Sequence, residues 1–440
     1  MFRPIKVMDV EFSRPLEDIE GLDEYRAVMG LVRFQGTPIG YITLPLHDGR
    51  CTALDLSRAI VDQHGTAIAR HLLRNRLAGP LQPDRLGIDD LFSMSPPAYD
   101  GPQPLVTVAV CTRDRTADLA LCLESVSRLD YPALDILVVD NAPSSDATER
   151  LVRSTYPAIR YVCEPRPGLN WARNRAIVEA RAEIIAYTDD DVVIDPGWVS
   201  ALARVFVENP EVMAVTGLVA PYELETEPQM FFEQYGGFGR GFERRWYRLD
   251  RENGRRETYH IHAGGFGTGA NMAYRRTLFG LIGGFDPGLD VGTVTNGGGD
   301  LEMFFRVLEE GHTLVYEPSA VVRHRHRRDY ASLQTQITNW GIGVCAFLVR
   351  SALAYPGKRL SIIHLGLWRN WYWNIRRLMV SLFRPPRFPR ALILAFLWGF
   401  ILGPLRYRKA RRCAGKIART VGPLPLGCLP TEMPCRPLLR

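Results

Sequence analysis

At Ile184-Ile185-Ala186-Tyr187-Thr188-Asp189-Asp190-Asp191 an apolar strand leads directly into three adjacent carboxylates. Side chains two residues apart in an extended segment point the same way, so we expect Asp189 and Asp191 to face one cavity and Asp190 to face the other side. Carboxylates this close repel one another, and a divalent cation such as Mg²⁺ or Mn²⁺ would compensate their charge. An isolated acidic triplet is more often a solvated turn, so the surrounding segments decide between the two interpretations.

Strand-like and helix-like segments alternate in front of this triplet. We expect strands at 106–110, 136–139, 159–162 and 183–187, with helices near 116–128, 145–154 and 171–181. This alternation predicts an α/β fold with a mostly parallel sheet and helices on both faces. Ligands bind such sheets outside the carboxyl ends of the strands. Those ends carry Thr112-Arg113-Asp114, Asp140-Asn141, Glu164 to Asn170 and the acidic triplet.

The chain of 440 residues has room for two or three domains. We expect a small α+β module at residues 1–95, with a hairpin within 25–44 and a helix at 53–77. A Pro- and Gly-rich linker from Pro96 to Pro104 separates it from the α/β domain at 105–330. Eight cysteines without a Cys-x-x-Cys pair, and the absence of an apolar leader, predict a reduced, cytoplasmic location for the catalytic part.

Four segments within 105–330 resemble the inverting nucleotide-sugar glycosyltransferases of family 2, which have a GT-A type fold. They are Val108 to Arg115, Val138 to Ala142, Arg166 to Asn174, and the acidic triplet, which takes the place of the family's DxD motif. The resemblance implies a nucleotide-sugar site made of Thr112, Arg113, Asp114, Asp140, Asn141, Gly168, Arg173, Asp189 and Asp190. It also implies a site for Mg²⁺ or Mn²⁺ made of Asp189, Asp191 and His324.

Two later segments extend the resemblance. Gly264 to Asn271 is similar to the family's acceptor-side loop, and Gly283 to Glu302 is similar to the segment that ends in its catalytic acid pair. The resemblance therefore implies Asp300 as general base and acceptor-side roles for Gly267, Thr268, Asn271 and Glu302. A dinucleotide-binding glycine motif is a competing interpretation of the first segment, but such a motif should directly follow a strand early in a βαβ unit.

This chain departs from the family at one position, because Gly299 stands where the family usually has Glu before the catalytic aspartate. From the residues alone, Asp300 is also a natural N-cap for the apolar-periodic helix that follows it and ends at Gly311. The two roles can coexist, and we expect Asp300 to be both base and cap.

The C-terminal quarter, residues 331–440, is basic and aromatic. Sixteen Lys or Arg and no Asp or Glu lie between Tyr330 and Thr431, whereas residues 1–329 carry a net charge of about −11. The apolar stretch 391–405 is shorter than the roughly 20 residues that span a bilayer, and basic residues flank both of its ends. We expect this helical tail to lie on the cytoplasmic leaflet, with an ordinary buried helix as the alternative.

Together these patterns predict a membrane-associated, metal-dependent inverting glycosyltransferase at the cytoplasmic face of the cell membrane. It would move a sugar from a nucleotide-sugar donor to a lipid-linked or polysaccharide acceptor in cell-surface glycan and cell wall synthesis. The alternative is a catalytically impaired scaffold of the same fold, which Gly299 suggests. We expect no nucleic-acid partner, since no zinc-finger spacing or RNA-binding aromatic signature is present.

Overall fold

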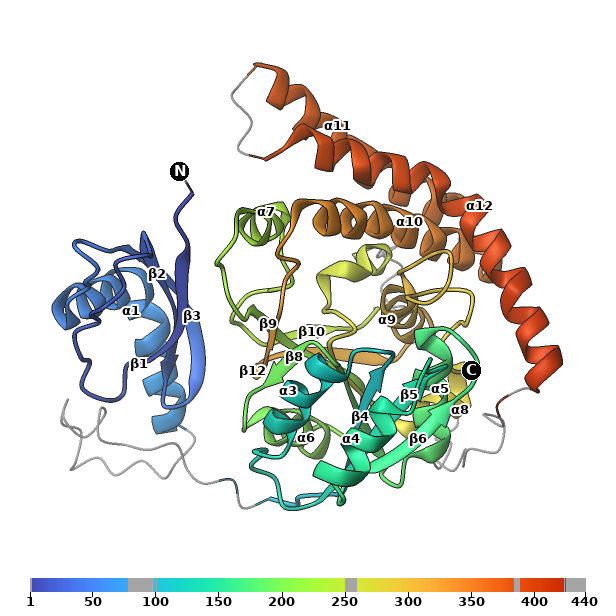
Figure 1. The fold of residues 1–440 in the computed structure, drawn as a ribbon, viewed down its shortest axis with the longest axis horizontal. Coiled ribbons are helices and arrows are strands. Elements are labelled where there is room, and N and C mark those ends of the chain that lie inside the picture. Colours follow the sequence, from blue (N-terminus) through green and yellow to red (C-terminus); the bar gives the residue numbers. More distant parts are fainter. Residues whose placement is uncertain are drawn as a thin grey trace.

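The structure is a computed structural model that describes residues 2–77, 99, 101–249, 259–383, 388–422 and 424. Residues 96–98 and 100 of the expected linker at 96–104 lie outside these residues. Figure 1 shows a central α/β body, an N-terminal module beside it and three long helices along one side.

The parallel half of the central sheet carries the strand ends expected to form the site. Strands β4 (Val106–Thr112), β5 (Leu134–Asn141), β6 (Arg160–Glu164) and β7 (Ile184–Asp189) pair in parallel in the order β7-β4-β5-β6. Helices α3 (Thr116–Val126), α4 (Ala147–Thr155) and α5 (Leu169–Glu179) connect them. The predicted alternation of strands and helices is confirmed.

The second half of the sheet is mixed rather than parallel. Within the described residues, β11 (Asn271–Arg275) lies antiparallel between β7 and β9 (Val212–Pro221), followed by β12 (Thr313–His324) and the edge strand β10 (Arg245–Tyr247). The short strand β8 (Val192–Ile194) pairs with the end of β12. The fold is thus the GT-A type expected, with an antiparallel strand inserted into it.

Both faces of the sheet are covered, because alternate side chains of the central strands enter two different apolar clusters. Val106, Val108 and Val110 of β4 pack with α3 and with α6 (Trp198–Glu208). Ala109 and Cys111 of the same strand pack on the side of α5 and α9 (Gly299–Glu309). Burial on both faces explains why β4 is a continuous apolar run instead of an alternating one. Helices α7 (Glu227–Tyr235) and α8 (Arg276–Ile282) complete the body.

The N-terminal module contains the expected hairpin and helix. Strands β2 (Ala27–Phe34) and β3 (Thr37–Pro45) are antiparallel, β1 (Ile5–Glu11) joins β2 in parallel, and α1 (Ala53–Leu77) covers the sheet. The module contacts the central body through ion pairs, since Arg33 pairs with Asp195 at 2.6 Å and Arg323 pairs with Asp9, and through apolar clusters such as that of Leu31 with Leu218.

The C-terminal region consists of α10 (Tyr330–Ala354), a short 3-10 turn, α11 (Arg359–Phe383) and α12 (Arg390–Val421). Helix α10 packs on α9, and α12 packs on α10 (Figure 1). Glycines allow the second contact: a Cβ at Gly399 would lie 2.0 Å from the Thr338 carbonyl oxygen, and one at Gly341 would lie 2.1 Å from that of Phe396. The stretch 391–405 is therefore part of a longer helix with one buried face.

Among the described residues, α10 and α12 are long and apolar enough to cross a membrane, and about half of each apolar window (56% and 44%) is buried within the protein. The apolar cluster on the α5 and α9 side of the sheet is the main apolar cluster. Because α10 contributes buried residues such as Leu333, Ile337 and Phe347 to it, α10 is part of the central body. The division into three domains at 1–95, 105–330 and 331–440 stays a prediction.

Candidate active site

A pocket of about 890 Å³ opens at the carboxyl ends of β4, β5 and β7. One end is polar and lies against the acidic triplet, and the other reaches α10, α11 and α12. Eleven of the predicted site residues line it: Thr112, Arg113, Asn141, Arg173, Asp189, Asp190, Asp191, Gly267, Thr268, Asp300 and His324. Residues predicted from seven separate segments thus meet in one cavity.

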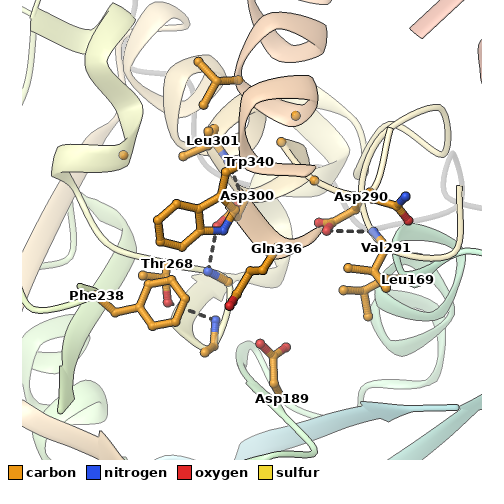
Figure 2. A pocket seen from close by; sticks show the side chains of 18 of the residues that line it. Leu169, Asp189, Phe238, Thr268, Asp290, Val291, Asp300, Leu301, Gln336 and Trp340 are labelled. Carbon is orange, nitrogen blue, oxygen red and sulfur yellow. Dashed lines mark hydrogen bonds between the residues drawn. The ribbon is translucent and has the colours of Figure 1, made fainter. Parts of the chain in front are cut away.

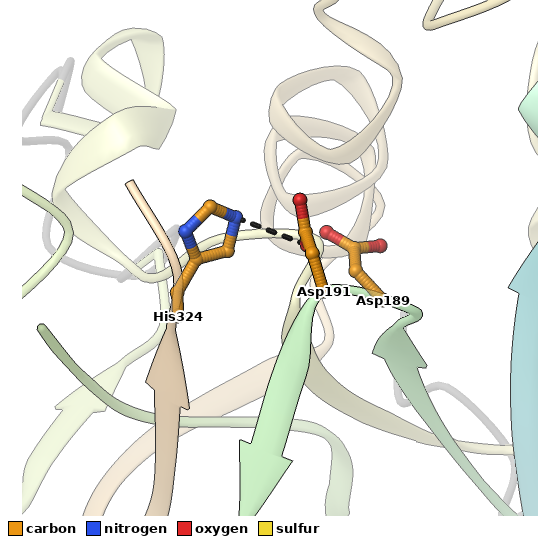
Figure 3. Close-up of side chains that lie close together, drawn as sticks. All are labelled: Asp189, Asp191 and His324. Atoms are coloured by element: carbon orange, nitrogen blue, oxygen red, sulfur yellow. Dashed lines mark ion pairs between the residues drawn. The ribbon is translucent and has the colours of Figure 1, made fainter. Parts of the chain in front are cut away.

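Three side chains at the polar end could hold a metal ion. Asp189 comes from the end of β7, Asp191 precedes β8 and His324 ends β12, and one ligand atom from each lies within 4.8 Å of the others (Figure 3). The strand pairing between β8 and β12 brings His324 to the triplet, since His324 lies opposite Val192. The alternation argument for Asp189 and Asp191 agrees with this arrangement.

The electrostatics of this cluster are those of a cation site. Burial raises the pKa of Asp189 to about 6, against the lowering effect of Arg173. Burial would also raise the pKa of Asp191, but His324, 3.3 Å away, and Arg115 hold it below its usual range. The Nδ1 atom of His324 is buried and has no hydrogen-bond partner among the described residues. Two carboxylates and the His324 imidazole, whose Nε2 faces Asp191, form a donor set that fits Mn²⁺ or Mg²⁺.

Asp190 points away from this cluster and holds the first strand end in place. Its carboxylate accepts a hydrogen bond from Thr112 Oγ1 at 2.8 Å and one from Arg115 at 2.7 Å. Arg115 also donates to Asp191 at 3.0 Å, so one guanidinium bridges two of the three carboxylates. Sequence reasoning missed Arg115 as a partner of the triplet, because nothing local indicates that residues 115 and 190 meet.

A second charged group lies between the polar end of the pocket and Asp300. Arg173, nearly fully buried, donates to Asp290 at 2.5 Å, and another of its nitrogens lies 3.9 Å from Asp189. Asp290 was not predicted, and its backbone has a left-handed φ of 77°. Figure 2 shows Asp290 on one side of the cavity, Asp300 beside Trp340, and Asp189 facing both from below.

Asp300 is held by two backbone donors. Its Oδ2 accepts from the Gly269 N–H and its Oδ1 from the Leu301 N–H, both at 2.8 Å. Burial, and then the charge of Asp290, raises its pKa above the ordinary value, while Arg173 opposes them. The expectation that Asp300 caps the helix is wrong: the N-cap is Gly298 with a φ of 92°, and Asp300 is the second residue of α9. A left-handed cap suits glycine and leaves Asp300 to reach across to the acceptor-side loop.

Close packing explains why residue 299 is a glycine in this chain. A Cβ at this position would lie 2.4 Å from the Asn170 amide nitrogen and 2.5 Å from the Asp290 carboxylate. Any side chain there would displace Asp290, because real Cβ contacts are not that short. A carboxylate from the 286–298 loop thus occupies the space beside the first turn of α9.

The other five predicted residues do not line the pocket. Asp114, with φ 53°, accepts from Ser144; Asp140 accepts from the Tyr161 hydroxyl at 3.0 Å; and Gly168 donates to Asn141. Asn271 accepts from the Trp198 indole and donates to two backbone carbonyls. Glu302 is fully buried between Arg306 at 2.7 Å and Arg350 at 2.8 Å. These hydrogen bonds and ion pairs hold the backbone and side chains around the pocket in place.

Residues 107–282 match the sequence model of Glycosyl transferase family 2. This segment of the chain is a glycosyltransferase family 2 domain. The match covers β4 to α8, and therefore the acidic triplet, Arg173 and the acceptor-side loop; Asp300 and His324 lie beyond it. Individual proteins named as glycosyltransferases are also similar to this chain.

A glucosyl-dolichyl phosphate glucuronosyltransferase of Haloferax volcanii is 25% identical over 236 residues, which are 50% of this chain and 69% of that enzyme. The human polypeptide N-acetylgalactosaminyltransferase 13 is 26% identical over 210 residues, 45% of this chain and 36% of that protein. A solved mannosyltransferase from Pyrobaculum calidifontis, in complex with GDP-Man and Mn²⁺, is 19% identical with a TM-score of 0.40, covering 84% of this chain and 88% of that one.

Proposed function

We propose that this family 2 glycosyltransferase moves a sugar from a nucleotide-sugar donor, with inversion and with a bound Mn²⁺ or Mg²⁺, to a lipid-linked or glycan acceptor at a membrane. The observation that carries the proposal is one cavity lined both by the cluster of Asp189, Asp191 and His324 and by Asp300. The characterised relative whose name includes a dolichyl phosphate supports a lipid-linked acceptor.

The donor diphosphate would lie at the polar end of the cavity. Asp189, Asp191 and His324 would hold the metal ion, which when bound would neutralise charge on the departing nucleoside diphosphate. Arg113 and Arg327 line the same end, and their side chains are 46% and 44% exposed, so both can approach phosphate oxygens. Arg173 is in reach of the reaction centre between Asp189 and Asp290.

Asp300 would act as the general base. The acceptor hydroxyl oxygen forms the new bond to the anomeric carbon, its proton passes to an Asp300 oxygen, and the electron pair of the breaking bond leaves with the diphosphate. Each Asp300 oxygen accepts one backbone hydrogen bond and keeps a second lone pair, so the carboxylate stays oriented and can still accept a proton. A single displacement from the face opposite the leaving group inverts the anomeric centre.

The membrane association would come from α11 and α12. Their outward faces expose large apolar side chains, such as Trp368 (61% exposed), Trp398 (58%) and Leu405 (70%). The same helices carry Arg or Lys and no acidic residue. Exposed aromatic side chains next to basic ones suit the headgroup region of an anionic leaflet, which we take to be the cytoplasmic one.

A donor-binding scaffold without transfer is the second candidate. This candidate was suggested by Gly299, which stands where the family usually has Glu. The Asp290 carboxylate lies beside that glycine and can supply the second acidic group from another segment, which argues against the scaffold.

One experiment tests the proposal. Purified full-length protein is incubated with nucleotide sugars, Mn²⁺ and a detergent extract of membrane lipids, and the anomeric configuration of the product is determined by NMR. We expect a product of inverted configuration whose formation stops with a chelator. Retained configuration, or transfer that survives the chelator, would contradict it.

A further inference from the structure

The pocket continues past Asp300 into an apolar end that the donor does not need. Trp340, Val344 and Phe347 of α10 line it, as does Phe396 of α12. The three α10 positions are four and three residues apart, so they form one stripe along the helix. Close packing places this stripe beside the base: a Cβ at Gly343 would lie 2.7 Å from the Gly297 carbonyl carbon, directly before α9.

Two cationic side chains line the same region. The guanidinium of Arg240 donates to the carbonyl oxygens of Gly264, Gly237 and Gly239. No carboxylate of the described residues lies within ion-pair distance of it, and burial lowers its pKa. Arg369 of α11 also faces the cavity, is exposed, and has no ion pair within the described part of the chain. A half-buried guanidinium with only neutral partners favours an anionic ligand.

A polar group at the junction fits a hydroxyl. Gln336 lies one helical turn before Trp340 and, as Figure 2 shows, projects into the cavity between Asp300 and Asp189. Its Oε1 atom is buried and has no hydrogen-bond partner among the described residues. A buried acceptor of this kind costs free energy unless a ligand donates to it, and a hydroxyl near Asp300 would do so.

We propose, on the basis of the proposed function, that this end of the pocket is the acceptor subsite for a long-chain lipid whose head group carries phosphate and the reacting hydroxyl. The chain lies along Trp340, Val344, Phe347 and Phe396, and the phosphate meets Arg240 and Arg369. The subsite borders on α11 and α12, whose outer faces carry the exposed apolar side chains, so we expect a lipid to enter it from that side.

Calorimetry on the full-length protein tests this subsite with decyl phosphate below its micelle concentration, decanol and inorganic phosphate as probes. We expect decyl phosphate to bind at least tenfold more tightly than either other probe. Arg369→Gln and Val344→Gln should each weaken decyl phosphate binding at least tenfold. Arg408→Gln, which removes the same charge from an exposed position of α12 outside the pocket, should leave it unchanged.

Equal binding by Arg369→Gln and wild-type protein would overturn the subsite, as would equal loss in Arg408→Gln, which would indicate only general charge attraction. Competition between decyl phosphate and a nucleoside diphosphate would also overturn it, by placing the lipid in the donor end. Binding of the nucleoside diphosphate with Mn²⁺ is measured in parallel on every variant. Its absence from wild-type protein would contradict the proposed function, while the lipid probes still decide the subsite.

Discussion

Replacing Asp300 by Asn should lower stability moderately and transfer strongly. The stability should fall because both oxygens of the carboxylate accept a backbone N–H. An amide offers one oxygen and one NH₂ group, so one of the two backbone donors would face another donor. Leaving a buried donor unpaired costs about 1–3 kcal/mol. For a domain of this size that is a fall in Tm of roughly 2–12 °C.

The effect on transfer should be larger than this loss explains. An amide cannot take the proton of the acceptor hydroxyl, so the rate should fall about 10²-fold or more, a barrier increase of at least about 2.7 kcal/mol. The assay is initial-rate release of nucleoside diphosphate, with the donor that stabilises the protein most and a membrane-lipid extract. Donor binding with Mn²⁺ should persist, since Asp300 is outside the metal cluster.

Asp135→Asn is the matched control. Asp135 is buried and also accepts hydrogen bonds at both oxygens, from Thr107 and Arg160, but it lies at the start of β5 outside the pocket. Its Tm should fall at least as far, with turnover per folded molecule unchanged. Turnover of Asp300→Asn within threefold of wild type, or an equal loss in both variants, would refute the assignment of Asp300 as base.

Three further outcomes are expected. Gly299→Ala should displace the Asp290 carboxylate and lower both Tm and transfer, whereas an unaltered transfer rate would show that Asp290 has no part in it. The acidic limb of the pH–rate profile should lie above the ordinary aspartate pKa of 3.8, because the pKa of Asp300 is raised and the base must be deprotonated. Activity should therefore fall as the pH falls through the raised pKa of Asp300. A limb that persists in Asp300→Asn would belong to another group. Trp368→Glu with Trp398→Glu should reduce sedimentation with anionic liposomes while Tm stays within about 2 °C of wild type, and unchanged sedimentation would count against the proposed membrane face.

The liposome test uses surface substitutions because truncation at about residue 330 would not isolate the tail. Leu333, Ile337 and Phe347 of α10 belong to the main apolar cluster, so the truncated chain would expose that cluster. The sequence pattern of the tail indicated its basic, apolar composition, but the contact between α10 and α9 depends on glycines about 45 residues apart, Gly298 and Gly343, which no local pattern connects.

The parallel half of the sheet could be predicted closely, because its central strands β4 and β7 are buried on both faces and are mostly apolar. The facing of Asp189 and Asp191 followed from strand alternation. In contrast, the cap of α9 and the role of Asp290 depend on left-handed backbone conformations at Gly298 and Asp290. Asp290 is held by Arg173, and Gly298 packs against Gly343; a one-dimensional pattern contains neither contact.

The most direct test of the account is whether the protein binds a nucleoside diphosphate through a metal ion at the acidic cluster. Thermal unfolding is measured with nucleoside diphosphates, with and without Mn²⁺, for wild-type protein and Asp191→Asn. At a ligand concentration of 100 Kd, binding to the native state adds about 2.7 kcal/mol, or roughly 5–10 °C in Tm. We expect this rise in wild-type protein only when nucleotide and Mn²⁺ are both present, and no rise in Asp191→Asn. A rise that is equal without metal, or equal in the variant, would contradict the account.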